Sequence, residues 1–181
     1  MFAYTEEVTF VLSIATALGG VAVISLIIFF LLRPRPNLWL SRFIARWGLW
    51  LALLITLTAT LGSLFYSDIA GFIPCKLCWY QRILMYPLPI LLGTAIWHKD
   101  YRISRYINPL TIIGALIAAY HYLLQLDITP LTSDCAIIGY GSSCSDRFFL
   151  ELGYITIPMM ALTAFVLINL LANGYKKFHS N

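Results

Sequence analysis

Charge is scarce in this sequence. Only 11% of its 181 residues are Asp, Glu, Lys or Arg, and 60% are hydrophobic, whereas about 25% of the residues of a typical soluble domain are charged. This shortage excludes an ordinary soluble domain, and the small net charge of +4 gives no reason to expect a nucleic-acid partner. Little polar sequence separates the apolar runs. The composition therefore predicts an all-α integral membrane protein with one compact membrane domain.

Five apolar runs are candidates for transmembrane helices. They cover residues 8–32, 47–66, 79–97, 106–126 and 152–172. The first run would be ~37 Å long as a helix, enough to cross a hydrocarbon core of ~30 Å. A signal peptide would carry positive charge before a shorter apolar stretch, but here Glu6 and Glu7 precede the run. We therefore expect a retained helix whose N-terminus lies outside the cytoplasm.

The basic residues predict the orientation of these spans. Nine of them lie in residues 33–46, 99–105 and 176–177, which all fall on one side of a five-span layout. The other side has only Lys76, Arg82 and Arg147. By the positive-inside rule the first side and the C-terminus are cytoplasmic. All four cysteines then face away from the cytoplasm, where disulfides persist.

A Cys-x-x-Cys motif, Cys75 to Cys78, stands where the third apolar run begins. A disulfide across so small a loop removes little chain entropy, so the pair is a poor staple and suits redox cycling better. A helix N-terminus and a nearby cation both favour a thiolate, and Arg82 shares a helix face with Cys78. The alternatives are a structural disulfide or half of a zinc site. Zinc would need two more soft ligands close by, so we expect no metal.

The second cysteine pair, Cys135 and Cys144, brackets a segment rich in glycine and serine. A structural staple of this loop is nearly as good an interpretation as a redox role. The presence of a Cys-x-x-Cys on the same side of the membrane favours a relay by thiol–disulfide exchange. Such a relay needs a terminal electron acceptor, and at the membrane edge a lipid-soluble one is the obvious candidate. Four cysteines allow three complete pairings, and the resting one stays open.

Three polar residues, Arg82, His121 and Gln125, are expected near the outer membrane edge. His121 and Gln125 are four residues apart and share a helix face. An interfacial position alone explains each of them. Their common depth also allows a quinone head group to bind among them.

These motifs together resemble the DsbB family of disulfide-bond formation proteins, including its BdbC-type members. The resemblance covers about residues 47–172 and rests on the following segments: residues 74–82, residues 121–126, the pair Cys135 and Cys144, and residues 153–158. It implies a four-helix bundle in the bacterial cytoplasmic membrane. Such a protein would reoxidise a DsbA-like thioredoxin-fold dithiol oxidase and pass the electrons to ubiquinone or menaquinone.

The resemblance also implies roles for individual residues. Cys135 matches the cysteine that forms a mixed disulfide with the partner, and Cys144 matches its mate, which pairs transiently with Cys75. Cys78 matches the thiolate that faces the quinone, with Arg82 stabilising the charge between them. His121 and Gln125 match positions near the quinone less closely.

The chain departs from the family pattern at its N-terminus. Residues 1–43 would form an additional transmembrane helix and a basic cytoplasmic loop, residues 44–175 the redox domain, and residues 176–181 a cytoplasmic tail. The segment between Cys135 and Cys144 is also shorter than in some members. Two alternatives stay open: a non-catalytic assembly subunit with disulfide-stapled outer loops, and an enzyme of the vitamin K epoxide reductase type, in which the loop cysteines precede the Cys-x-x-Cys.

Overall fold

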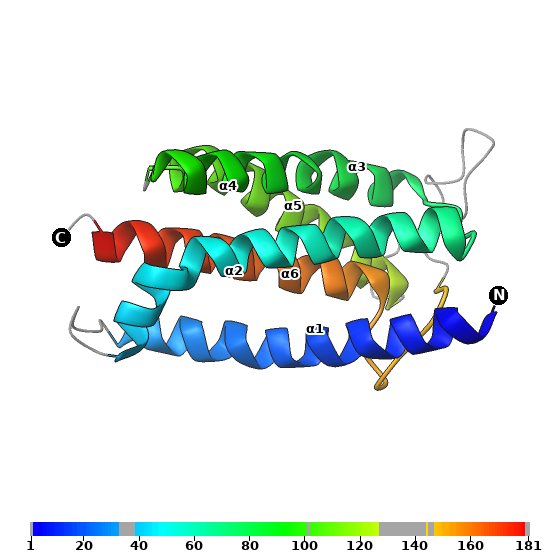
Figure 1. The fold of residues 1–181 in the computed structure, drawn as a ribbon. Coiled ribbons are helices and arrows are strands. Elements are labelled where there is room, and N and C mark those ends of the chain that lie inside the picture. The colour runs from blue at the N-terminus through cyan, green and yellow to red at the C-terminus, as the bar shows by residue number, and fades with distance from the viewer. Residues whose placement is uncertain (1, 33–38, 101, 127–143, 145–146, 180–181) are drawn as a thin grey trace.

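The computed structural model describes residues 2–32, 39–100, 102–126, 144 and 147–179, and nearly all of this chain is helical. The helices lie side by side along a common direction (Figure 1). They are α1 (Phe2–Leu31), α2 (Trp39–Leu64), α3 (Lys76–Met85), α4 (Pro87–His98), α5 (Ser104–Gln125) and α6 (Ile157–His179), with a π-helical turn, η1 (Phe65–Ile69), after α2.

Four helical segments in the described chain are long and apolar enough to cross a membrane: Thr5–Leu31, Trp39–Ile69, Ser104–Gln125 and Ile157–Phe178. They correspond to four of the five predicted spans, so the prediction of an all-α, multi-pass membrane protein is confirmed. The predicted third span, residues 79–97, is instead two shorter helices, α3 and α4, which follow each other along one edge of the bundle (Figure 1). Pro87 is the first residue of α4, and because proline has no backbone N–H and a fixed φ, it starts a new helix more readily than it continues one. A fifth crossing made by α3 and α4 together stays a prediction.

Three helix starts differ by several residues from the predicted ones, and the first is that of α1, which begins at Phe2 rather than at residue 8. Helix α2 begins at Trp39 rather than at residue 47, so the basic, aromatic approach to the span is itself helical. Helix α6 begins at Ile157 rather than at residue 152. The delay has a local cause: Leu152 and Gly153 have φ values of 51° and 78°, and Glu151 pairs with Ile155 in an antiparallel bridge. This tight turn cannot be the first turn of a right-handed helix.

Helix α6 forms the centre of the bundle and packs against α2, α5 and α1. Its side chains Phe165, Ile168 and Ala172 are fully buried. The ring of Phe165 fits against α5 because residue 114 is glycine, where a Cβ atom would lie only 2.5 Å from two ring carbons. Small residues that allow such close approach are typical of helix contacts in membranes.

An asparagine cluster joins α5 and α6 near the helix ends that the charge pattern predicts to be cytoplasmic. The Nδ2 of Asn108 donates to Oδ1 of Asn173 at 3.0 Å, and Asn169 donates to Oγ1 of Thr111 at 2.9 Å. Interhelical hydrogen bonds of this kind stabilise membrane bundles by about 0.6–2 kcal/mol each. They hold α5 in a definite rotation relative to α6, which matters for the site because α5 carries His121.

Candidate redox site

Cys75 is the N-cap residue of α3. It has extended backbone angles, φ −74° and ψ 173°, and its Sγ accepts a hydrogen bond from the backbone N–H of Cys78 at 3.4 Å. Sulfur here takes the part that a serine or aspartate oxygen usually plays at a helix start. The Cys-x-x-Cys pair therefore begins α3 as predicted, with one free N–H of the first turn, that of Cys78, directed at the Cys75 sulfur.

The two sulfur atoms lie 3.2 Å apart, with the Cys75 thiol donating to Cys78 Sγ. This hydrogen bond, together with burial, raises the pKa of Cys75 to about 12. The same hydrogen bond lowers the pKa of Cys78, and the positive charge of Arg82 lowers it further, while burial opposes both. Cys78 is therefore the thiol of the pair that loses its proton first, and Cys75 keeps its proton to higher pH.

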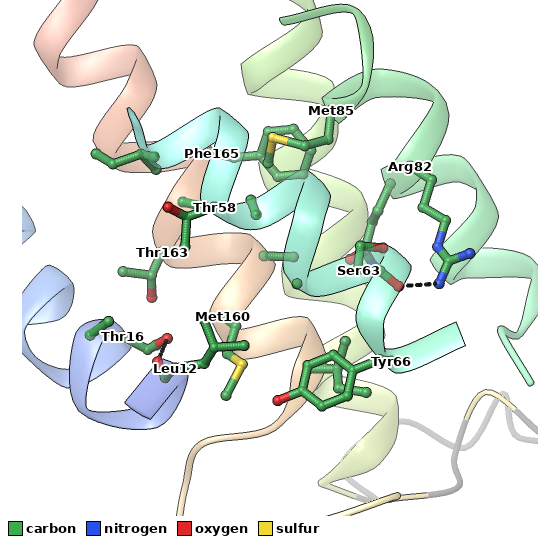
Figure 2. Close-up of a pocket in the computed structure, with 18 of the residues that line it drawn as sticks. Leu12, Thr16, Thr58, Ser63, Tyr66, Arg82, Met85, Met160, Thr163 and Phe165 are labelled. Carbon is green, nitrogen blue, oxygen red and sulfur yellow. Dashed lines mark hydrogen bonds between the residues drawn. The ribbon is translucent and has the colours of Figure 1, made fainter. Parts of the chain in front are cut away.

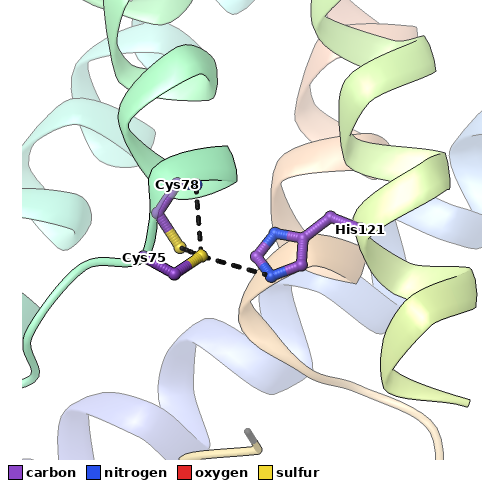
Figure 3. A group of neighbouring side chains, drawn as sticks. All are labelled: Cys75, Cys78 and His121. Carbon is purple, nitrogen blue, oxygen red and sulfur yellow. Dashed lines mark hydrogen bonds between the residues drawn. The ribbon is translucent and has the colours of Figure 1, made fainter. Parts of the chain in front are cut away.

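A buried histidine contacts Cys75 from the neighbouring helix α5 (Figure 3). The Nε2 atom of His121 lies 3.6 Å from Cys75 Sγ, and its Nδ1 atom lies 3.0 Å from Nε2 of Gln81. His121 is 2% exposed and Gln81 is 6% exposed. With the Gln81 amide donating to Nδ1, the imidazole carries its proton on Nε2 and presents it to Cys75.

Gln81 is a site residue that the sequence interpretation missed. It stands between the motif and Arg82, one turn after Cys78, and an uncharged amide there attracts less attention than an arginine. The signal was present, because a glutamine at the start of an apolar run needs hydrogen-bond partners if it is buried.

Arg82 lies on α3 one turn beyond Cys78, as predicted. Its Nη2 donates to the backbone carbonyl of Ser63 on α2 at 3.0 Å (Figure 2). Its guanidinium also lies over the Trp79 ring, 5.5 Å from the ring centroid. Two neighbours thus hold the cation in place, and it remains close enough to Cys78 to stabilise the thiolate.

The second cysteine pair is described only in part. Cys144 is 2% exposed and packs in one small cluster with Cys75 and Leu124, whereas Cys135 lies outside the described residues. Gln125 is buried on the last turn of α5, and its backbone carbonyl accepts a hydrogen bond from Nε of Arg147 at 2.6 Å. Cys144 therefore lies beside the Cys-x-x-Cys pair, in a cluster that includes Cys75 and has Cys78 packed against it.

A cavity of about 300 Å³ opens beside the motif. Such a volume is at the lower end of the ~300–1,000 Å³ typical of small-molecule sites. Cys78, Gln81 and Arg82 line one part of it, and apolar side chains of α1, α2 and α6 line most of the rest. His121 and Gln125 do not line this cavity. The structure thus brings Arg82 and Cys78 together at a cavity and places His121 behind them, against Cys75.

A metal ion is the other group that these side chains could hold. The ligand atoms of Cys75, Cys78 and His121 all lie within 4.8 Å of one another. The sequence interpretation required two more soft ligands beside the cysteines, and the fold supplies one of them. No fourth Cys, His, Asp or Glu joins this group among the described residues, so the set is one ligand short of a closed structural zinc site.

The sequence of this chain is similar to those of known disulfide bond formation proteins. The model of the family "Disulfide bond formation protein DsbB" matches residues 45–173. Disulfide bond formation protein C of Bacillus subtilis (strain 168) is 49% identical over 114 residues, which cover 63% of this chain and 81% of that protein. A probable disulfide formation protein C of Halalkalibacterium halodurans is 40% identical over 121 residues, covering 67% and 85%. A probable disulfide formation protein of Metapseudomonas resinovorans is 39% identical over 119 residues, covering 65% and 81%.

No solved structure matches the chain. The family model, however, covers well over half of it, including the Cys-x-x-Cys motif, its arginine and the helix that carries His121. The chain therefore belongs to the DsbB family of disulfide bond formation proteins.

Proposed function

We propose that this protein is a membrane thiol:quinone oxidoreductase that reoxidises a DsbA-like thioredoxin-fold dithiol oxidase outside the cytoplasm. The observation that supports this most directly is the state of the Cys-x-x-Cys pair. Its two sulfur atoms lie 3.2 Å apart, the pKa of Cys78 is lowered, and Cys78 and Arg82 both line the cavity. A reactive thiolate at the wall of a membrane cavity suits electron transfer to a lipid-soluble acceptor better than it suits a structural staple.

The first exchange takes place at the outer pair. A thiolate of the reduced partner attacks the Cys135–Cys144 disulfide at Cys135, and the partner's second thiolate then attacks the mixed disulfide. The partner leaves oxidised, and two electrons and two protons remain on Cys135 and Cys144. This step needs no other oxidant, since thiol–disulfide exchange conserves electrons.

The second exchange passes the electrons inward. Cys144 attacks Cys75 in the Cys75–Cys78 disulfide, and Cys135 then attacks Cys144, which restores the outer disulfide and leaves the inner pair reduced. Attack at Cys75 is favoured because it releases Cys78, whose lowered pKa makes it the better leaving group. The packing of Cys144 in one cluster with Cys75 and Cys78 supports an exchange between the two pairs.

His121 and Gln81 determine the hydrogen bonding of the Cys75 sulfur. His121 faces Cys75 Sγ with Nε2, and the Gln81 amide fixes the opposite ring nitrogen. The Nε2–H held at this sulfur stabilises Cys75 as a thiolate when it leaves the transient bond to Cys144, and the proton that Cys135 gives up on its attack then passes to Cys75. We assign His121 this role; the quinone contact predicted for His121 and Gln125 stays a prediction.

The cavity beside Cys78 fits a quinone. It has polar lining at the end of Cys78, Gln81 and Arg82, and apolar lining elsewhere, which matches a polar ring with an apolar tail. When bound, the quinone, either ubiquinone or menaquinone, supplies the oxidising power by accepting two electrons and two protons. Arg82, held by the Ser63 carbonyl, keeps a positive charge at the head-group end. Cys78 supplies the sulfur that meets it.

The charge pattern supports an orientation with the motif outside. The N-terminus of α1 lies at the same end of the bundle as the start of α3, and the C-terminus lies at the opposite end (Figure 1). We assign the first end to the extracytoplasmic side of the bacterial cytoplasmic membrane and the second to the cytoplasm, because the basic residues gather at the second.

Anaerobic quinone reduction tests the function. Purified protein is supplied with a reduced thioredoxin-fold oxidase and either a ubiquinone or a menaquinone analogue, and quinone absorbance is followed. We expect catalytic reduction that disappears in Cys78→Ser while the helical circular dichroism is unchanged. Folded wild-type protein that reduces neither quinone would refute the proposal and favour the non-catalytic subunit with stapled loops.

A further inference from the structure

The additional helix α1 contributes directly to the cavity beside Cys78. Its residues Leu12, Ala15, Thr16 and Gly19 line the cavity together with side chains of α2 and α6. The family model begins only at residue 45, so α1 lies wholly outside the matched segment. The cavity beside Cys78 is therefore lined in part by a helix that lies outside the family match.

Contacts at both ends hold α1 in this position. Near its start, Thr9 Oγ1 accepts a hydrogen bond from the Tyr66 hydroxyl at 3.2 Å. Near its end, the Phe30 ring stacks on Phe178 with centroids 6.4 Å apart, and Lys177 Nζ lies 5.6 Å from the centroid of Phe30. The cavity-lining residues lie between these two anchors. These contacts fix the position of α1 relative to the bundle, so α1 forms a stable wall of the cavity.

The part of the cavity lined by α1 is suited to an apolar ligand. The Thr16 hydroxyl donates to the Leu12 carbonyl at 2.8 Å, and the Thr163 hydroxyl on the opposite wall donates to the Met159 carbonyl at 2.9 Å. Both hydroxyls are satisfied by their own helices. What remains for a ligand in this part of the cavity is hydrocarbon apart from the Thr58 hydroxyl of α2, and Met160 and Leu12 lie close by (Figure 2).

The cavity is also long in the direction of the bundle. On α6 its lining extends from Ile157 to Leu167, which is about 15 Å along a helix axis. Its polar lining lies near Cys78 and Arg82, while α1 lines the part near Gly19 and Leu167. A quinone head group at Cys78 would therefore direct its tail toward α1.

We propose that α1 binds the isoprenoid tail of the quinone and so helps to select quinones by their tails. This inference rests on the proposed function. A phospholipid acyl chain has the same apolar chemistry, but it would not place a reducible ring at Cys78. We commit to the quinone because the apolar part of the cavity is continuous with the thiolate and its arginine.

Photolabelling tests the inference without relying on turnover. Wild-type protein in detergent is incubated with a ubiquinone analogue that carries a diazirine in its side chain, irradiated and digested, and the label is located by mass spectrometry. We expect label within residues 12–19, which unlabelled long-tailed ubiquinone competes away and phospholipid does not. Label confined to other helices, or competed equally by phospholipid, would overturn the inference.

A matched pair of variants on α1 sharpens the test. Thr16→Phe fills the wall of the cavity, whereas Leu18→Phe adds an aromatic ring at a position that is 66% exposed on the outer face of the same helix. We expect Thr16→Phe to abolish the label on α1 and to raise KM for long-tailed quinone about tenfold, a loss of about 1.4 kcal/mol of binding. KM for a short-tailed analogue, and both KM values of Leu18→Phe, should be unchanged. If Thr16→Phe does not fold, the wild-type labelling decides alone.

The outcomes separate this inference from the function on which it rests. Wild-type protein that reduces quinone but shows no quinone-competed label on α1 refutes only the role of α1. Wild-type protein that reduces no quinone and shows no quinone-competed label anywhere refutes both.

Discussion

The assignment of Cys78 as the thiolate predicts a large difference in reactivity between two cysteines three residues apart. The pKa of Cys75 is raised from 9.0 to about 12, whereas the pKa of Cys78 is lowered below 9.0. Raising a thiol pKa by three units reduces its thiolate fraction near neutral pH about 1,000-fold, because each unit changes the ratio tenfold. Because thiolate nucleophilicity falls as the pKa falls and offsets about half of this difference on a logarithmic scale, we expect iodoacetamide to alkylate Cys78 at least about 30 times faster than Cys75 at pH 7 in reduced protein.

The assay follows each cysteine separately. Reduced protein in detergent is pulsed with iodoacetamide between pH 6 and 10, quenched, unfolded and labelled with a second reagent. The two cysteines are quantified by mass spectrometry in protein that keeps both of them, because the two pKa values depend on the hydrogen bond between Cys75 and Cys78. The rate at Cys78 should reach its midpoint below pH 9, since the midpoint marks the pKa. The rate at Cys75 should still be rising at pH 10. Denatured, reduced protein, in which both cysteines react alike, controls for intrinsic reactivity.

Arg82 should control the position of the Cys78 curve. Arg82→Met removes the positive charge that lowers the pKa of Cys78, so its alkylation midpoint should move to higher pH. Lys76→Met is the matched control, because Lys76 also carries a positive charge in the first turn of α3 but is exposed and does not shift Cys78. Equal rates at the two cysteines, or equal midpoint shifts in the two variants, would refute the reasoning.

Three further predictions follow from the packing and from the donor set. Gly114→Ala places a Cβ 2.5 Å from the Phe165 ring, whereas the control variant Gly93→Ala meets nothing within 4 Å. Both variants gain the same helix propensity, so Gly114→Ala should be less stable than Gly93→Ala by about 1–3 kcal/mol in SDS unfolding from mixed micelles. Equal stabilities of the two variants would contradict this packing. Gln81→Leu leaves Nδ1 of buried His121 without its partner, so it should cost about 1–3 kcal/mol in the same assay and slow thiol exchange at the inner pair, whereas an unchanged exchange rate would remove Gln81 from the site. Zinc added to reduced, metal-free protein should be bound at the two cysteines and His121 and block alkylation, an effect that His121→Ala should weaken; undiminished protection in that variant would exclude the histidine as a ligand.

The sequence by itself determined the class of molecule and the chemistry of its motif. The shortage of charge and the long apolar runs indicated a multi-pass helical membrane protein, because only such runs are stable in hydrocarbon. The spacing of Cys75, Cys78 and Arg82 over about two helical turns placed all three at one helix start, since contacts between residues three or four apart follow from helix geometry alone. The same local logic missed the turn at Leu152 and Gly153 that delays α6.

The tertiary structure alone decided which groups meet across helices. His121 reaches Cys75 over 46 positions of sequence, the Ser63 carbonyl reaches Arg82 over 19, and α1 lines the cavity beside Cys78. These contacts depend on how each helix is rotated about its axis. In a soluble protein the polar face of a helix reveals that rotation, but in a bilayer the lipid-facing side and the buried side are both apolar. Helix α1 is apolar on nearly every side, so only a short row of small polar residues, Thr9, Ser13 and Thr16, indicates the face that it turns toward the bundle.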